Sequence, residues 1–147
     1  MPDFLSPVQR SKLMSRVKNR DTKIEIAIRS ILHRSGFRFR RNVKSLPGKP
    51  DIVLPKYNAT IFVHGCFWHG HSCIKGKLPA TRVAFWREKI SGNQNNDKDL
   101  QTQLLDAGWR VAVIWECAYR NREKGQESTD LLRKWIISNS QYCEIPL

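Results

Sequence analysis

The stretch Ile61-Phe-Val-His-Gly-Cys-Phe-Trp-His-Gly-His-Ser-Cys73 decides how the rest of the chain is interpreted. It holds three of the four histidines and two of the four cysteines of the protein. Its first residues are β-branched or aromatic and Gly65 interrupts the run, which predicts a strand over residues 59–63 and then a loop. Loops on a rigid scaffold often carry chemistry, so these side chains indicate a metal or catalytic site. A half-buried loop with hydrogen-bonded histidines is the alternative.

The length and cysteine usage indicate a single domain in a reducing compartment. A chain of 147 residues can bury a core of its own, so we expect one domain over residues 1–147. No signal-peptide pattern and no run as long as a membrane span is found in the sequence. We therefore expect a cytoplasmic protein whose cysteines stay reduced, where Cys/His clusters more often bind metal than form disulfides.

The charge is strongly basic and unevenly distributed. The net charge is +13, and residues 1–50 hold 13 basic and 3 acidic residues, which supply +10 of it. Such an excess indicates a polyanionic partner, with nucleic acid first among the candidates. A solubilising surface, or association with ribosomes or lipid, is the alternative. Residues 1–20 are predicted to form a basic arm or helix that begins near Ser6-Pro7 and orders on its partner.

Strand and helix signals alternate along the chain and predict an α/β fold. Asp21 or Thr22 caps an amphipathic helix that ends near Ser35-Gly36. Further strands are predicted over residues 37–43, 51–54 and 110–115, and further helices over residues 81–90, 93–106 and 131–137. The short spacing of the strands over residues 37–63 predicts an antiparallel meander. The expected architecture is a mixed β-sheet flanked by helices.

Four side chains have the character of zinc ligands. Cys66, His71 and Cys73 lie in one loop, and Cys117 follows the strand predicted over residues 110–115. Structural zinc takes four nitrogen or sulfur ligands in a tetrahedron. If the two strands lie side by side, their carboxyl ends bring these residues together. The alternative is that the cysteines are small buried hydrophobic residues. Cys143, near a terminus expected to fray, is left out of the set.

A second group combines acids with histidines. Asp51 opens one strand and His64 closes the next, and in an antiparallel pair these ends are neighbours. A carboxylate there could hold Mg²⁺ against a phosphate, and His64 or His69 could transfer protons near neutral pH. The alternative for Asp51 is an aspartate that closes a turn. Glu25 is a further candidate, although an acid in the first turn of a helix ordinarily interacts with the helix dipole.

Aromatic residues form the third group. Phe67 and Trp68 lie between Cys66 and His69, and Trp86 lies near Lys89 and Asn93. Aromatic side chains among basic residues can stack on bases or wedge between base steps. Core packing is the alternative, and it is stronger for Trp86 because that residue shares an apolar helix face.

Taken together, these motifs resemble the very short patch repair (Vsr) DNA mismatch endonucleases. The resemblance runs from about residue 11 to residue 124, and the block from His64 to Cys73 is specific to that family. The matching segments are Gly48-Lys-Pro-Asp51, His64-Gly-Cys-Phe-Trp-His-Gly-His-Ser-Cys73, Pro79-Ala-Thr-Arg82, Phe85-Trp86, Lys89-Ile90, Asn93, Asp97, Gly108-Trp-Arg-Val111 and Trp115-Glu-Cys117.

The resemblance implies a restriction-endonuclease-like core with an added structural zinc, and a Mg²⁺-dependent nick 5′ to the T of a T:G mismatch in double-stranded DNA. Such mismatches arise when 5-methylcytosine deaminates. The enzyme would act as a monomer at the nucleoid, with other repair proteins as further candidate partners. General nucleases of this type carry an acid-x-Lys motif on the second strand, where this chain has Phe62-Val63-His64.

Each motif position acquires an implied role. Asp51 and the main-chain carbonyl of Val63 would hold Mg²⁺, and His69 would activate the attacking water. His64 and Glu25 would contact metal-bound waters or the phosphate. The implied zinc ligands are Cys66, His71, Cys73 and Cys117, the implied wedge is Phe67, Trp68 and Trp86, and the implied contacts to the mispaired bases are Lys89 and Asn93.

Two other functions compete with this one. A non-catalytic zinc-containing DNA-binding module needs basic and aromatic residues but no acid facing the phosphates, so Asp51 with His64 and His69 argues against it. An ordinary type II restriction enzyme would usually be a larger dimer that cuts both strands.

Overall fold

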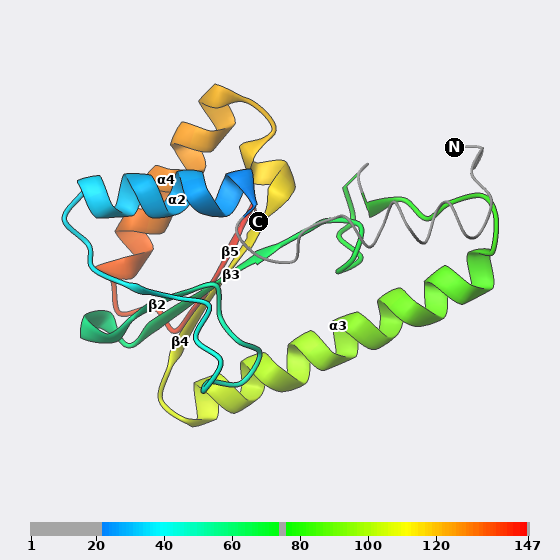
Figure 1. The fold of residues 1–147 in the computed structure, drawn as a ribbon, viewed down its shortest axis with the longest axis horizontal. Helices are drawn as coiled ribbons and strands as arrows, with labels where there is room; N and C mark the ends of the chain where they lie inside the picture. Colours follow the sequence, from blue (N-terminus) through cyan, green and yellow to red (C-terminus); the bar gives the residue numbers. More distant parts are fainter. Residues whose placement is uncertain (1–21, 74–75, 147) are drawn as a thin grey trace.

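A five-stranded mixed sheet forms the centre of the protein. The computed structural model describes residues 22–73 and 76–146. The strands lie in the order β1-β2-β3-β4-β5, and Figure 1 shows helices on both faces of the sheet. In chain order the elements are α2 (Lys23–Arg34), β1 (Arg40–Arg41), β2 (Ile52–Leu54), the 3-10 helix η1 (Pro55–Tyr57), β3 (Ala59–His64), α3 (Val83–Asp106), β4 (Arg110–Trp115), the 3-10 helix η3 (Glu116–Tyr119), α4 (Arg122–Ile136) and β5 (Tyr142–Ile145).

The strand directions bring three chain segments to one edge of the sheet. β1, β2 and β3 pair antiparallel, whereas β3 pairs parallel with β4 and β4 parallel with β5. The predicted antiparallel meander is confirmed, and the strands over residues 59–63 and 110–115 lie side by side, which is the condition for their carboxyl ends to meet. Because β3 and β4 are parallel, His64 lies opposite Trp115. The beginning of β2 therefore meets the ends of β3 and β4 at the same edge.

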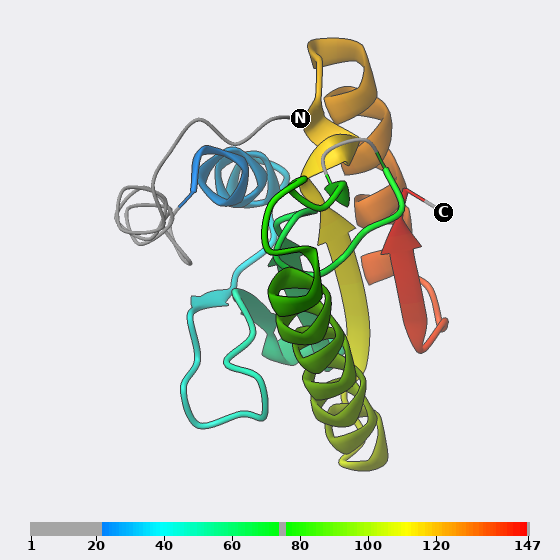
Figure 2. The same cartoon turned by 90° about the vertical axis from the view of Figure 1, so that its right-hand side faces the viewer.

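The two faces of the sheet carry separate apolar clusters. α2 and α4 cover one face, where Ile28 and Leu132 pack with Ile61 and Ile114. α3 covers the other face, where Leu104 packs on Phe62 and on β4 (Figures 1 and 2). Each fully buried aliphatic side chain contributes about 1.5–3 kcal/mol to folding. Side chains that alternate along β3 and β4 thus attach helices to both sides of the sheet.

α2 begins and ends as the sequence predicts. The Thr22 hydroxyl accepts a hydrogen bond of 3.2 Å from the Glu25 amide, and Ser35 is the C-cap. Ile28 and Leu32 are fully buried, while Ile24 and Ile31 are partly buried. The predicted apolar stripe therefore faces the sheet, and it carries Glu25 into the interior.

The two helices predicted over residues 81–90 and 93–106 are one continuous helix, α3. It runs for 24 residues through Gly92, whose missing side chain faces open space. A glycine in a helix interior costs about 1 kcal/mol relative to alanine. That cost is outweighed by tertiary contacts on both sides of it, with Ile90 and Leu104 buried and Asn93 and Gln94 bonded to the loop after β3.

Three smaller predictions need correction. The strand predicted over residues 37–43 is only two residues long, because Phe37 and Phe39 pack against the core from an irregular segment. The last helix begins at Arg122, nine residues earlier than predicted. Cys143 does not lie in a frayed end: it belongs to β5, where it pairs with Ala112 of β4.

The predicted basic arm over residues 1–20 lies outside the described residues. Among the described residues, none of the helices combines the length and the apolar character needed to span a membrane.

Candidate active site and metal centre

Asp51 lies directly before β2, at the edge where β3 and β4 end. Its Oδ2 atom accepts a hydrogen bond of 2.6 Å from the backbone amide of Val63. This contact joins the beginning of one strand to the end of its antiparallel neighbour, as the sequence predicts. It also brings the carboxylate close to the main chain of Val63 and to His64.

His64 is the last residue of β3 and is buried, with 5% of its surface exposed. Its ring stacks on that of His69, with centroids 3.8 Å apart and planes 4° from parallel. The pKa of His64 is lowered to about 3, mainly by burial and also by the neighbouring His69, while Asp97 opposes the shift. The imidazole is therefore neutral at neutral pH. Its Nδ1 atom has no hydrogen-bond partner among the described residues.

His69 is paired with a carboxylate that the sequence argument had not assigned to the site. The Nδ1 atom of His69 lies 2.5 Å from Oδ2 of Asp97 in the middle of α3. Candidate ligand atoms of His64, His69 and Asp97 all lie within 4.8 Å of one another. The signal that could have found Asp97 is its spacing: it follows Asn93 by four residues, so both side chains lie on one helix face.

Side chains on one face of α3 bind the loop that follows β3 at several points. Asn93 donates a hydrogen bond of 2.9 Å to the carbonyl of Trp68, and Gln94 donates one of 3.0 Å to the carbonyl of Gly70. Asp97 holds His69 one turn further on. Since α3 is a single helix, these contacts share one rigid support.

A second cluster contains the four predicted zinc ligands. Candidate ligand atoms of Cys66, His71, Cys73 and Cys117 all lie within 4.8 Å of one another, and Cys117 Sγ is 3.5 Å from His71 Nδ1. The set of three sulfurs and one nitrogen is the donor set of structural zinc sites. Burial raises the pKa of the Cys66 and Cys117 thiols, whereas a bound dication favours thiolates. The predicted Cys₃His cluster is thus confirmed.

Trp115, the last residue of β4, lies between the two clusters. It stacks on His71 with centroids 4.3 Å apart and meets His64 edge-on at 5.2 Å. Its indole nitrogen donates a hydrogen bond of 2.6 Å to Glu144 on β5, which holds the ring in place. The Trp115 ring therefore contacts both the Cys₃His cluster, through His71, and the stacked pair of His64 and His69, through His64.

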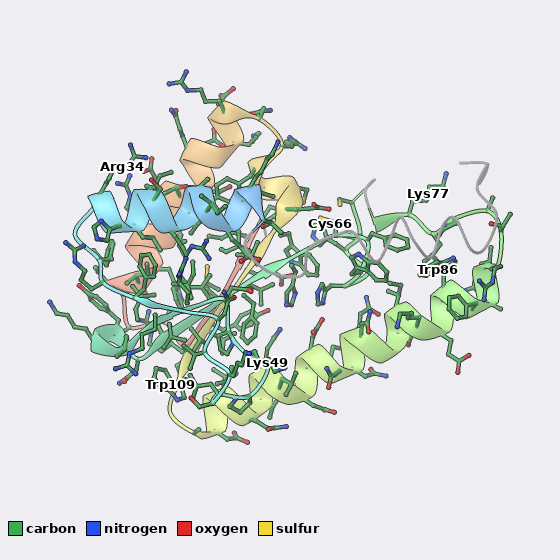
Figure 3. All side chains as sticks on the ribbon, viewed as in Figure 1. Arg34, Lys49, Cys66, Lys77, Trp86 and Trp109 are labelled. Atoms are coloured by element: carbon green, nitrogen blue, oxygen red, sulfur yellow. The ribbon has the colours of Figure 1, made fainter. Side chains whose placement is uncertain are left out.

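The predicted wedge residues form an aromatic group beyond the end of the sheet. Phe67 and Trp68 are partly buried, and Trp86 is buried beside them, with ring centroids 5.2–6.0 Å apart. Figure 3 labels Cys66 just past β3 and Trp86 in the first turns of α3. The neighbouring Phe85 is 44% exposed, and Lys89 is exposed one turn after it. The three rings pack edge-to-face on one another, and Phe67 and Trp68 remain partly exposed to solvent.

Glu25 is buried, with 1% of its surface exposed, and forms an ion pair of 3.9 Å with Arg29. Neither Glu25 nor Asp51 belongs to a group of three or more potential metal ligands within 4.8 Å among the described residues. The structure thus brings together Asp51 with Val63, and His64 with His69 and Asp97.

Comparisons with known proteins identify relatives of this chain. Residues 2–75 match the family described as DNA mismatch endonuclease Vsr. The chain is 44% identical over 147 residues to the DNA mismatch endonuclease Vsr of Escherichia coli (strain K12), a match that covers 99% of this chain and 94% of that protein. It is 50% identical over 117 residues to the type II nicking enzyme V.XorIIP of Xanthomonas oryzae pv. oryzae, covering 80% of this chain and 86% of that protein. It is 44% identical over 136 residues to the type II nicking enzyme V.NmeAIP of Neisseria meningitidis, covering 92% of this chain and 97% of that protein.

Proposed function

Because this chain belongs to the Vsr family of DNA mismatch endonucleases, we propose that it nicks one strand of duplex DNA 5′ to the T of a T:G mismatch. Its family makes it a DNA endonuclease, and the base pair that it recognises is the proposal. Such a mismatch results from deamination of 5-methylcytosine, and the nick would begin very short patch repair. The main support is the carboxylate of Asp51 at the end of β3, the strand that closes with His64, together with His69, which stacks on His64 and faces the Asp97 carboxylate.

The oxygen atoms near Asp51 suit a hard divalent cation. The Asp51 carboxylate and the Val63 carbonyl are oxygen ligands of the kind that Mg²⁺ prefers. Bound there, Mg²⁺ would polarise the phosphoryl oxygens and neutralise charge on the phosphate. The unpartnered Nδ1 atom of buried, neutral His64 could accept a hydrogen bond from water at this site. Glu25 would assist from α2.

His69 is the proposed general base. Its Nδ1 atom faces the Asp97 carboxylate at 2.5 Å, which favours the tautomer that carries the proton on Nδ1. The lone pair is then on Nε2, and Nε2 can take the proton from the attacking water. Asp97 would stabilise the imidazolium that forms, as carboxylates do when they orient a catalytic histidine.

Recognition of the mismatch is assigned to the aromatic group. Separating stacked bases costs a few kcal/mol per step, and less where base pairing is already poor. Insertion of Phe67, Trp68 and Trp86 would therefore favour a mismatched step over a normal one. Lys89 and Asn93 would contact the mispaired bases. Asn93 also binds the Trp68 carbonyl, which would link base contact to the position of the wedge.

The basic part of the chain is proposed to track the DNA backbone. Residues 26–50 contain seven lysines and arginines and no aspartate or glutamate. Arg41 of this segment pairs with Ile52, so its strand runs beside the residue that follows Asp51. Residues 1–20 would add a basic arm. We propose that the protein acts as a monomer on the nucleoid in the cytoplasm, with other repair proteins as candidate partners.

A nicking assay tests the proposal. Duplexes with one end-labelled strand and a T:G pair, a U:G pair or a normal pair are incubated with the protein in Mg²⁺, and the products are mapped at single-nucleotide resolution. We expect a nick only 5′ to the mispaired T. Asp51→Asn should abolish nicking while binding persists, because affinity comes mainly from phosphate contacts. Equal cleavage of the perfect duplex, or full activity of Asp51→Asn, would contradict the proposal.

A further inference from the structure

Lys49 has a backbone conformation that its residue type disfavours. Its φ angle is +48°, in the left-handed region where a Cβ atom crowds the following carbonyl. Pro50 follows it, and the residue before a proline is pushed towards extended φ values near −120°. Both effects act against this conformation, and glycine would adopt it at less cost.

The other residues of this kind in the described chain have local explanations. Asn42 and Asn58 are also left-handed, but asparagine tolerates this region. Arg82 is left-handed at the start of α3, where its guanidinium lies 4.2 Å from the centroid of the Phe85 ring. Lys49 has no such contact. Strained residues concentrate at functional sites, so an outlier whose own side chain makes no supporting contact indicates a functional role.

The loop around Lys49 is held firmly. The Lys49 amide donates a hydrogen bond of 3.1 Å to the Leu46 carbonyl, which closes a turn with Pro47 second and Gly48 third. A Cβ atom on Gly48 would lie 3.0 Å from the Phe62 ring and 3.3 Å from Leu100. The turn is therefore wedged between β3 and α3, one helical turn from Asp97. The strain at Lys49 is maintained by this packing.

The Lys49 side chain is exposed beside the candidate active site. Figure 3 labels it on the loop that leads into β2, near the C-terminal half of α3. No salt bridge or side-chain hydrogen bond joins Lys49 to another residue described in the structure. Lys49 precedes Asp51 by two residues, a separation of at most about 7 Å between Cα atoms. A phosphate held at Asp51 is thus within reach of the ammonium group.

We propose that Lys49 is a catalytic residue that binds the phosphate undergoing hydrolysis. In the reaction the water oxygen bonds to phosphorus, one ester P–O bond breaks, His69 takes the proton of the water, and the leaving oxygen takes a proton from solvent. Negative charge on the phosphoryl oxygens develops in the transition state, and a fixed ammonium group stabilises it without reorganisation. This role rests on the proposed nuclease function. Lys49 would also supply the positive charge that general nucleases of this type carry as the lysine of their acid-x-Lys motif, where this chain has Phe62-Val63-His64.

Matched variants separate this role from a structural one. Lys49→Asn and Lys49→Gly remove the charge but suit a left-handed backbone, so both should fold with an unchanged or higher Tm. Lys49→Arg keeps the charge. The control is Lys56→Asn, which removes a lysine from η1 at the opposite end of β2, where it lies 5.6 Å from the Tyr57 ring. Single-turnover nicking of T:G duplex is measured with enzyme in excess, so that binding does not limit the rate.

We expect Lys49→Asn and Lys49→Gly to nick about 10²-fold more slowly, the usual effect of removing one donor to a developing oxyanion. Lys49→Arg should recover part of the rate, and Lys56→Asn should match the parent. If the parent protein and Lys49→Gly nick equally fast, the proposed role of Lys49 is wrong, while the proposed nuclease function stands. A fall equally large in Lys56→Asn would also overturn the role of Lys49, because bulk charge would then be responsible. A parent that nicks no duplex would overturn the proposed function and this role together.

Discussion

At the scale of single residues, two neighbouring imidazoles lie in different surroundings. His64 and His69 are stacked within 3.8 Å, yet only His69 has a carboxylate partner at Nδ1. Burial lowers the pKa of His64 to about 3, so its imidazole is neutral at neutral pH. We therefore assign different roles to two identical side chains in the proposed reaction.

The pairing of His69 with Asp97 predicts strongly non-additive variants. His69→Ala should slow nicking by about 10²- to 10⁴-fold, the usual contribution of a general base. Asp97→Asn should slow it through loss of the correct tautomer. In the His69→Ala background, Asp97→Asn should then cost little more, since residues that act as a unit are not additive. Single-turnover rates of the double-mutant cycle measure this.

The control for that cycle is Asp99→Asn, an exposed carboxylate on the same helix. It should leave the rate unchanged. If the fold reductions in nicking rate caused by Asp97→Asn and His69→Ala multiply in the double variant, Asp97 acts independently of the histidine.

At the scale of elements, the continuity of α3 decides the relative positions of the functional loops. The same helix holds Trp68, Gly70 and His69, and its Leu100 packs near Gly48. A break near Gly92 would uncouple the aromatic group from the residues around Asp51.

Two glycine substitutions test this arrangement and should change stability in opposite directions. Gly92→Ala should raise the unfolding free energy by up to about 1 kcal/mol, because the site is helical and open. Gly48→Ala should lower it by about 1–3 kcal/mol, since its φ of +76° is left-handed and the added Cβ would press on Phe62. Denaturant unfolding of both variants gives the comparison. Destabilisation by Gly92→Ala would indicate that the helix is interrupted there.

The Cys₃His cluster joins the loop after β3 to η3 after β4. Metal analysis should find about one zinc per chain. Structural zinc can supply on the order of 10 kcal/mol of folding free energy, so Cys117→Ser, or removal of the metal by a chelator, should unfold the protein as followed by circular dichroism. Cys143→Ser on β5 removes a thiol outside the cluster and should have a much smaller effect. Normal melting of zinc-free protein would contradict the assignment.

At the scale of the whole molecule, one loop carries both the proposed mismatch wedge and the proposed general base. Phe67 and Trp68 directly precede His69, while Cys66 and His71 tie the same loop to the metal centre. Insertion of the wedge and placement of the base are therefore expected to occur together.

Trp68→Ala tests this connection. It should reduce nicking of T:G duplex far more than binding to perfect duplex, because nonspecific binding depends on phosphate contacts. Tryptophan emission should be quenched by mismatched DNA in the parent and less so in the variant. Parental nicking rates in both Phe67→Ala and Trp68→Ala would mean that the aromatic group serves only for packing.

Much of the site was determined by the sequence alone. The residue types of the 61–73 stretch specify strand, loop and ligands locally, and the apolar patterns of residues 24–32 and 110–115 specify a helix and a buried strand. A short connection joins β2 to β3, so the two strands pair antiparallel and the start of β2 lies beside the end of β3. The meeting of Asp51 with the end of β3 at Val63 and His64 was therefore predictable.

Other features were decided only by tertiary structure. The continuity of α3 through Gly92, the pairing of β5 and the short β1 depend on long-range packing, which overrides local propensity. The His69–Asp97 contact joins residues 28 positions apart, and local spacing shows only that Asp97 shares a helix face with Asn93. The left-handed conformation of Lys49 opposes its own residue type and persists because Gly48 is packed between Phe62 and Leu100. Sequence patterns report local preference, whereas these contacts arise where the fold overrides it.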